Sequence, residues 1–494
     1  MDAFARLSPT LLQPSCLGVC QVERAAFKFS TLSQLENKLL HRARALLSRG
    51  LGSRMVSGFV LVAMLTVISK GVSFLKDAAV VRQFGISDEL DAFMFSFGLL
   101  TFIGALIGGG LPEAFLPLYA EVTHQKSPVR ARRLAIQGTF LHAASLFLAC
   151  VVLYFLAPQF VGWTTRGFTP EKQALAAGLM RQLLPFMACL GLGYQLGTWL
   201  RADKHFQAAT SAPMLVPLAV IAALLLDWRS PDARTLVLGT LAGGFLQVLV
   251  LVIVLWRGER LTLAFVAGCL RNWEPEVRQM LRKALPFLFA GAIFNTAVVV
   301  DQTMAAWLEA GSVVVLGYTD KVCGIILAVT AAPSCDVLFP YFADKVARRD
   351  WIGVRRQLFT SAGVVLSAGL PAALLLSAFA PWVVQLLFER GSFTPEDTER
   401  VAAVLRYAAL QIPFYILGSL ASRVVVALQA TNFIILIACF ATVGNALLNL
   451  LFMRTMGAAG IALSTVLVQM LSAGLACLYV LRQIKARLAQ NPPD

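Results

Sequence analysis

Apolar stretches of about 20 residues follow one another along almost the whole chain, separated by short loops. As a helix, each stretch is long enough to cross the ~30 Å hydrocarbon core of a bilayer, whereas a barrel strand needs only about ten residues. A soluble domain carries roughly 25% charged residues. Here only 14% of the residues are charged and 58% are hydrophobic. We therefore predict an all-α, polytopic membrane protein.

Twelve such stretches are predicted to span the membrane. They cover residues 56–75, 89–110, 134–157, 178–199, 209–227, 234–256, 284–308, 312–341, 359–385, 401–421, 431–452 and 457–481. Most of the 42 lysines and arginines lie in loops on one side of this arrangement, and basic loops mark the cytoplasmic side. Both termini are therefore predicted to be cytoplasmic. The basic loops are expected to face anionic membrane lipids, and no nucleic-acid partner is expected.

One sequence pattern occurs twice and divides the chain into related halves. Residues 162–186 and 388–413 share an Arg-Gly-(Ser)-Phe-Thr-Pro-Glu turn, and Phe168 and Phe393 in these turns are 225 positions apart. Six spans in each half return the chain to its starting side, so the repeat is parallel. This symmetry predicts two six-helix lobes that move around a central cavity.

The domain boundaries follow from these spans. We predict an N-terminal extension at 1–55, lobes at 56–256 and 284–481, a cytoplasmic linker at 257–283 and a tail at 482–494. The extension is basic and amphipathic, which is typical of a helix on the cytoplasmic membrane surface; the alternative is that translation starts at Met55. An Ala-Pro pair, at 157–158 and at 380–381, is expected to end an apolar run in each half.

Basic residues within or beside the spans suggest a binding site for an anion. Each charged residue at the centre of a span costs about 2.5–3.5 kcal/mol on insertion scales. Lys70, Lys76, Arg82 and Lys321 are predicted to line a cationic, water-filled cavity that attracts a group such as pyrophosphate. The alternative is that these residues only pair with acids and hold helices together.

Four acids complete this set. Asp77, Asp91, Asp301 and Asp320 are predicted to position the basic residues or to take up a coupling ion. Asp77 and Asp301 are 224 positions apart, in step with the repeat.

Other motifs carry less information. Gly108, Gly109 and Gly110 are predicted to break a helix or to let two helices approach closely, and either would suit a gate. No nucleophile elbow, phosphate-binding loop or paired-carboxylate pattern is present. The nine cysteines show no metal-ligand spacing. We expect no enzyme activity, no metal site and no cofactor.

Several segments together resemble the MurJ/MviN lipid II flippases of the multidrug/oligosaccharidyl-lipid/polysaccharide superfamily. They are Ser69–Asp77, Asp91–Phe93, Ala114–Pro117, Phe388–Phe393, Asn449-Leu450 and Gly457–Thr465. The resemblance implies a helical fold of two lobes with a central cationic cavity. It also implies movement of undecaprenyl-pyrophosphate-linked sugars from the inner to the outer leaflet of the bacterial cytoplasmic (inner) membrane, by alternating access.

The resemblance also implies roles for individual residues. Arginines that face the substrate in this family match Lys70, Lys76 and Lys321, so the charge is kept without the guanidinium fork, and an acid at the start of its second span matches Asp91. Ile103-Gly104 stands where the family has a basic pair, and its last two spans have no counterpart. A flippase for an exopolysaccharide repeat unit therefore remains an alternative to one for lipid II.

We predict a flippase for a polyprenyl-pyrophosphate-linked saccharide, used in peptidoglycan or envelope polysaccharide synthesis. Membrane potential or a monovalent cation is expected to drive it, and envelope-synthesis enzymes are its expected partners. The remaining alternatives are a cation-coupled exporter of small amphiphiles and a membrane-embedded glycan ligase or polymerase.

Overall fold

The computed structural model describes residues 53–227, 232–258, 263–271, 273–428 and 430–490. The chain divides into two compact units between Met64 and Leu65. Of the first unit, only residues 53–64, at the start of a helix, are described. The predicted extension at 1–55 therefore lies almost entirely outside the described residues. The described residues contain helices and no strand, which confirms the all-α prediction.

The helices of the first half are α2 (Ser53–Phe84), α3 (Asp88–Gln125), α4 (Pro128–Thr164), α5 (Pro170–Ala202), α6 (Phe206–Ser211), the 3-10 helix η1 (Ala212–Met214), α7 (Leu215–Leu226) and α8 (Ala233–Gly258). A short helix, α9 (Leu263–Arg271), lies in the linker. The second half contains α10 (Glu276–Ala305), α11 (Ser312–Ala347), α12 (Trp351–Ala378), α13 (Ala380–Phe388), α14 (Pro395–Ala408), α15 (Gln411–Ala427), α16 (Thr431–Met456) and α17 (Ala458–Gln490).

Each predicted span overlaps one or more of these helices. Nine helical segments among the described residues are long and apolar enough to cross a membrane, so the polytopic architecture is confirmed and the count of twelve stays a prediction. Several helices are longer than the predicted spans: α3, for example, runs to Gln125, well beyond residue 110. The fifth predicted span is a composite of α6, η1 and α7.

The two Ala-Pro pairs do not have the same effect, which corrects the prediction made from the repeat. In the first half α4 continues through Pro158 to Thr164. A proline inside a helix frees the carbonyl four residues earlier, and here the Nε of Arg181 donates to that carbonyl, on Tyr154, at 3.0 Å. The side chain of Arg181 therefore helps α4 to pass Pro158 without ending.

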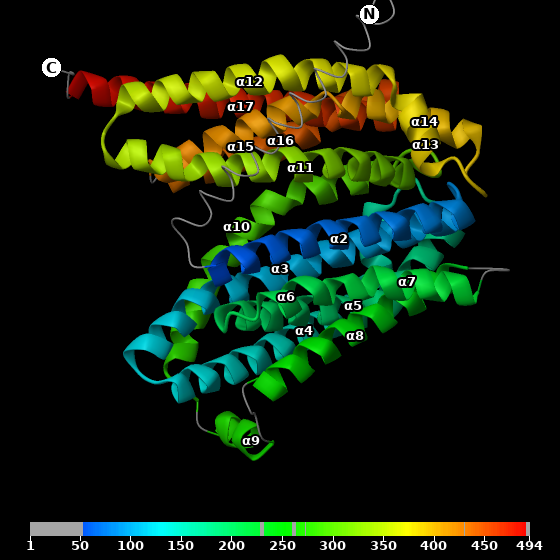
Figure 1. Ribbon diagram of the computed structural model, residues 1–494. Helices are drawn as coiled ribbons and strands as arrows, with labels where there is room; N and C mark the ends of the chain where they lie inside the picture. The colour runs from blue at the N-terminus through cyan, green and yellow to red at the C-terminus, as the bar shows by residue number, and fades with distance from the viewer. Residues whose placement is uncertain (1–52, 228–231, 259–262, 272, 429, 491–494) are drawn as a thin grey trace, which may run out of the picture. The chain divides into compact units, whose positions relative to one another are not determined.

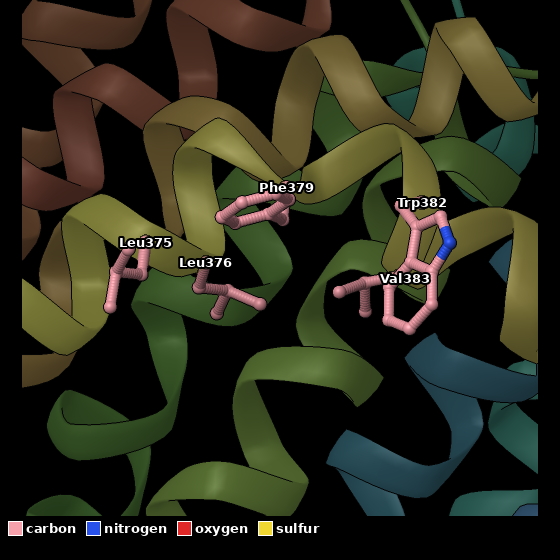
Figure 2. A pocket seen from close by; sticks show the side chains of 5 residues that line it. All are labelled: Leu375, Leu376, Phe379, Trp382 and Val383. Atoms are coloured by element: carbon pink, nitrogen blue, oxygen red, sulfur yellow. The ribbon is translucent and has the colours of Figure 1, made fainter. Parts of the chain in front are cut away.

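In the second half the helix does break. The helix α12 ends at Ala378, and α13 starts at Ala380 with a proline in its first turn, a position where the missing N–H costs nothing. An apolar pocket of about 530 Å³ opens at this break, as Figure 2 shows. Its lining residues are Leu375, Leu376, Phe379, Trp382 and Val383.

The helix α10 is shared between the two halves. Met280, near its start, is buried in a core cluster with first-half residues such as Leu118 and Leu134. Further along, α10 packs against α16 and α17 of the second half. Figure 1 shows α10 lying between the two groups of helices.

The loops 85–87, 165–169, 306–311 and 389–394 lie together, and we call this region the elbow end. The backbone N–H of Ser392 donates to the carbonyl of Arg82 at 2.8 Å, and the indole N–H of Trp307 donates to the carbonyl of Thr164 at 2.7 Å. Each of these bonds joins the first half to the second. A large core cluster beside the elbow end also contains residues of both halves.

Candidate substrate and cation sites

Two lysines from different halves share one carboxylate, and we call Lys76, Asp77 and Lys321 the Asp77 cluster. The Nζ atoms of Lys76, on α2, and Lys321, on α11, each lie 2.8 Å from Oδ1 of Asp77. The Asp77 side chain is 12% exposed. Two ammonium groups and one carboxylate leave the cluster with one net positive charge. An anion is the ligand that would complete its charge balance.

Aromatic rings hold both lysines in place. The Nζ of Lys321 lies 4.6 Å from the centre of the Tyr318 ring, and that of Lys76 lies 6.0 Å from the centre of the Phe97 ring. An ammonium group over a ring face gains cation–π attraction. These contacts orient the two lysines without neutralising their charge.

The other two predicted cations lie apart from this cluster. Lys70 precedes Asp77 by seven residues, so it lies on the same face of α2 about two turns away, and its side chain is exposed. Arg82 lies near the end of α2 at the elbow end, with its side chain exposed. The structure thus brings Lys76 and Lys321 together and places Lys70 and Arg82 on either side of them along α2.

Asp301 has a different environment, made of neutral polar groups. The Nδ2 of Asn449 donates to Oδ1 of Asp301 at 2.6 Å, and Oγ1 of Thr465 lies 3.4 Å from Oδ2. The Oδ1 of Asn445 lies 3.3 Å from the Asn449 amide nitrogen. We call Asp301, Asn445, Asn449 and Thr465 the Asp301 cluster. The cluster joins α10, α16 and α17. Its one acidic residue lies among side chains that carry oxygen atoms, and none of its four members is basic.

Two further features add to the negative character of this cluster. The Oδ1 of Asn449 is buried and accepts no hydrogen bond from the described residues. Asp320 on α11 is close enough to Asp301 for their charges to interact, and the residue is exposed. The sequence prediction named both acids but missed Asn445 and Thr465. An Asn pair four residues apart in an apolar helix was the available signal.

Asp91 is part of a contact between the halves that we call the elbow clamp. Its fully buried carboxylate accepts the backbone N–H groups of Gly311 at 3.1 Å and Val314 at 3.0 Å, at the start of α11. Lys172 on α5 completes the contact, with Nζ 2.6 Å from Asp91 and 2.7 Å from Asp88. A carboxylate at a helix N-terminus is stabilised by the free N–H groups. The elbow clamp therefore holds α3, α5 and α11 together.

The three glycines do not break α3, which runs unbroken from Asp88 to Gln125. Of the two effects predicted for them, close approach is the one observed. A Cβ on Gly108 would lie 2.8 Å from the Cα of Gly191 on α5, and one on Gly110 would lie 2.5 Å from Leu288 on α10. A Cβ on Gly109 would meet nothing within 4 Å.

Acidic residues before and at the start of α10 attach it to the first half. Lys126 pairs with Glu276, and Nη2 of Arg130 lies 2.9 Å from Oε2 of Glu274. Burial on its own would raise the pKa of Glu276. The hydrogen bond and charge of Lys126, with the charge of Arg130, outweigh burial and hold that pKa below its usual value of 4.5.

Comparison with known proteins places this arrangement in a family. The profile of the family described as "Lipid II flippase MurJ" matches residues 80–491. A probable lipid II flippase MurJ from Rickettsia prowazekii is 22% identical over 87% of this chain and 84% of its own length. The lipid II flippase MurJ of Burkholderia cenocepacia is 25% identical over 83% of this chain and 79% of its own.

Solved structures agree on the fold. A lipid II flippase MurJ in an inward closed conformation is 19% identical, with a TM-score of 0.73 over 86% of this chain and 87% of its own. An inward-facing MATE family multidrug transporter of the MOP superfamily is 17% identical, with a TM-score of 0.73 over 88% of this chain and 99% of its own. The profile match extends over most of the sequence, and the chain therefore belongs to the MurJ family of lipid II flippases.

Proposed function

We propose that this protein moves lipid II, an undecaprenyl-pyrophosphate-linked saccharide, from the inner to the outer leaflet of the bacterial cytoplasmic membrane. Family membership supports the substrate class. The observation that carries the proposal is the net positive charge of the Asp77 cluster, which joins α2 of one half to α11 of the other. The pyrophosphate of the substrate is the anion that this cluster would bind.

The geometry suggests how binding would act on the two halves. Lys76 and Lys321 now donate to the same oxygen of Asp77. A pyrophosphate between the lysines would offer each of them acceptors of its own, and charge-assisted hydrogen bonds are stronger than neutral ones. Bound substrate would then replace part of the contact between α2 and α11. No covalent step is assigned to the chain.

The Asp301 cluster is suited to a monovalent cation that couples to transport. Carboxylate, amide and hydroxyl oxygens are the ligands that hard cations prefer, and one carboxylate suits a single positive charge. The buried, unpaired Oδ1 of Asn449 fits this assignment, because an oxygen with no donor is costly to bury unless a ligand satisfies it. A bound cation would neutralise Asp301. A charge that moves across the full membrane potential changes the free energy by about 2.3 kcal/mol per 100 mV.

The elbow clamp supports a proposal in which the cytoplasmic side of the protein opens first. The basic loops predict that both termini are cytoplasmic. The elbow end would then face outward, and there the carboxylate of Asp91 joins the two halves. The central site would then load from the cytoplasmic side and release outward once the clamp opens. Close packing of Gly108 and Gly110 against α5 and α10 gives these glycines a part in that movement.

Complementation tests the proposal. Cells depleted of their lipid II flippase would receive the unmutated chain, Lys321→Ala or Lys321→Arg, with protein levels measured in membranes. We expect growth with the unmutated chain, retained growth with Lys321→Arg and none with Lys321→Ala. Failure of the well-inserted, unmutated chain to restore growth would reject lipid II and leave the exopolysaccharide repeat unit as the substrate. Growth with Lys321→Ala would reject the role of the Asp77 cluster.

A further inference from the structure

A second cavity, of about 310 Å³, lies wholly among first-half helices, and we call it the first-half cavity. Residues of α2, α3, α5, α6, η1, α7 and α8 line it. On α5 its lining extends from Phe186 to Arg201, and at 1.5 Å per residue this is a length of roughly 20 Å. The first-half cavity is therefore long and narrow.

Its two ends each carry a cation. Lys76 of the Asp77 cluster lies over Phe97, whose ring stacks on Phe186 at 5.5 Å, so Lys76 marks one end. Arg201, in the last turn of α5, marks the other end and is exposed. The α5 residues that line the two ends are roughly 20 Å apart, so one phosphate group does not span the cavity. A single ligand that contacts both needs a second group for Arg201, and an acidic group is the one that a guanidinium binds most strongly.

No acid lines the first-half cavity. The guanidinium of Arg201 donates through Nη2 to Oγ1 of Thr198 at 2.8 Å, and within the described part of the chain no carboxylate pairs with it. Most of its five N–H donors are therefore available. A planar guanidinium matches a carboxylate through two parallel hydrogen bonds.

Neutral polar groups line the cavity between the two cations. The Thr101 hydroxyl is buried and has no hydrogen-bond partner among the described residues. Gln247 is 5% exposed and reaches across to Gly193, so its amide lies at the cavity wall. Hydroxyl and amide groups of this kind suit the hydroxyls and amides of a sugar more than a hydrocarbon tail.

A glycine gives the cavity its width. Gly197 is buried, yet a Cβ built on it would meet nothing within 4 Å. A buried position with open space beside it must face the cavity. A large side chain at this position would fill the passage between Gln247 and Arg201 without a clash at its Cβ.

We propose that the first-half cavity receives the saccharide head group of the transported lipid and that Arg201 binds a carboxylate on that head group. This inference rests on the proposed function, because it places the pyrophosphate at Lys76. It deepens that function by making Arg201 a specificity-determining residue: the protein prefers an acidic head group over a neutral one of the same size.

Binding of short-chain analogues to the purified full-length protein in detergent tests this inference. The probes are two farnesyl-pyrophosphate-linked saccharides that differ only in a head-group carboxylate, free in one and amidated in the other. We expect the unmutated protein to bind the acid about 10-fold or more tightly than the amide, the effect of one charge-assisted hydrogen-bonded pair. Arg201→Gln should remove this preference, and Arg234→Gln, an exposed arginine outside the cavity, should keep it.

A cavity-filling pair gives an independent readout. Gly197→Leu should weaken binding of both probes. Gly178→Leu is the matched control on the same helix, because a Cβ there also meets nothing within 4 Å and the residue does not line the cavity. Equal affinity for acid and amide, no binding of either, or a preference that survives Arg201→Gln would overturn the inference. Normal acid-selective binding with no transport would instead reject the proposed function.

Discussion

Asp77 and Asp301 lie 224 positions apart in the two halves, but their neighbours differ in charge. Two lysines surround Asp77, which leaves an excess of positive charge. Two asparagines and a threonine surround Asp301, which leaves an excess of negative charge. Matching positions in the two halves of the sequence therefore have surroundings of opposite charge.

The partners of each acid explain this difference. The residues 225 positions before Asn445 and Asn449 are Val220 and Leu224, and both are buried and apolar. The first half thus has nothing at these positions to hold a cation. Lys321, by contrast, comes from α11 of the second half and reaches across to α2. The Asp77 cluster therefore needs both halves, whereas the Asp301 cluster is built from α10, α16 and α17 alone.

The largest effect is expected at Lys321. In Lys321→Ala, the Asp77 cluster loses its net positive charge, because Lys76 and Asp77 then balance each other. One charge-assisted hydrogen bond is worth about 1.5–3 kcal/mol, so translocation of lipid II into proteoliposome lumens should fall about 10- to 100-fold. Lys321→Arg is the control and should retain most activity. Full activity in Lys321→Ala would show that transport does not need the positive charge of the Asp77 cluster, and would contradict its contrast with the Asp301 cluster.

A smaller effect is expected at Asp301. In Asp301→Asn the cation loses its one charged ligand, so translocation should no longer depend on the concentration of a monovalent cation and should fall about tenfold, the equivalent of about 1.4 kcal/mol. Asp344→Asn, an exposed acid paired with Arg348 on the same helix turn, should behave like the unmutated protein. Unchanged cation dependence in Asp301→Asn would show that the Asp301 cluster is only structural.

The glycines of α3 should affect stability in opposite directions. In Gly108→Ala the new Cβ would lie 2.8 Å from the Gly191 backbone, and such overpacking costs about 1–3 kcal/mol. In Gly109→Ala the Cβ meets nothing within 4 Å, so a gain of about 0.5–1 kcal/mol is expected from reduced backbone freedom in the unfolded chain. Thermal unfolding in detergent measures both, and equal shifts would contradict the close approach of α3 and α5.

The smallest effect is expected at Glu276, an acid outside the predicted spans. Its pKa is held below 4.5, so its pairing with Lys126 contributes stability above pH 4.5 and loses it as the pH falls through the folded-state pKa. Because the Lys126 side chain is 44% exposed, solvent screening limits the contribution to about 1 kcal/mol or less. Glu276→Gln should lower the melting temperature at pH 7 and reduce its fall as the pH drops below 4.5. An unchanged pH profile would show that Glu276 does not stabilise the start of α10.

Sequence periodicity and hydropathy predicted most of the fold, because a membrane requires long, internally hydrogen-bonded helices. They did not predict where the helices end. Pro158 was expected to end a span, but the freed carbonyl of Tyr154 accepts a hydrogen bond from Arg181, which lies 27 residues away in sequence. Contacts of this kind depend on tertiary structure, and no local pattern shows them.

The candidate sites were predicted only in part, because some of their contacts also depend on tertiary structure. Isolated charges in apolar spans identified Asp77, Asp301 and Lys321, since each carries a high insertion cost. The uncharged side chains of Asn445 and Thr465 carry a smaller insertion cost and were missed. Asp91 was expected to assist binding or coupling, yet its contacts are those of the elbow clamp, and Lys172 in that clamp had no sequence signal.

The most direct test of the central claim is to measure binding of an anion and of a cation to the same set of purified variants. The claim is that the Asp77 cluster binds the anion and the Asp301 cluster binds the cation. Calorimetry would measure farnesyl pyrophosphate and sodium ion separately on the unmutated protein, Lys321→Gln and Asp301→Asn. The account predicts that Lys321→Gln weakens only pyrophosphate binding and that Asp301→Asn weakens only sodium binding. Loss of pyrophosphate binding in Asp301→Asn, or intact pyrophosphate binding in Lys321→Gln, would contradict it.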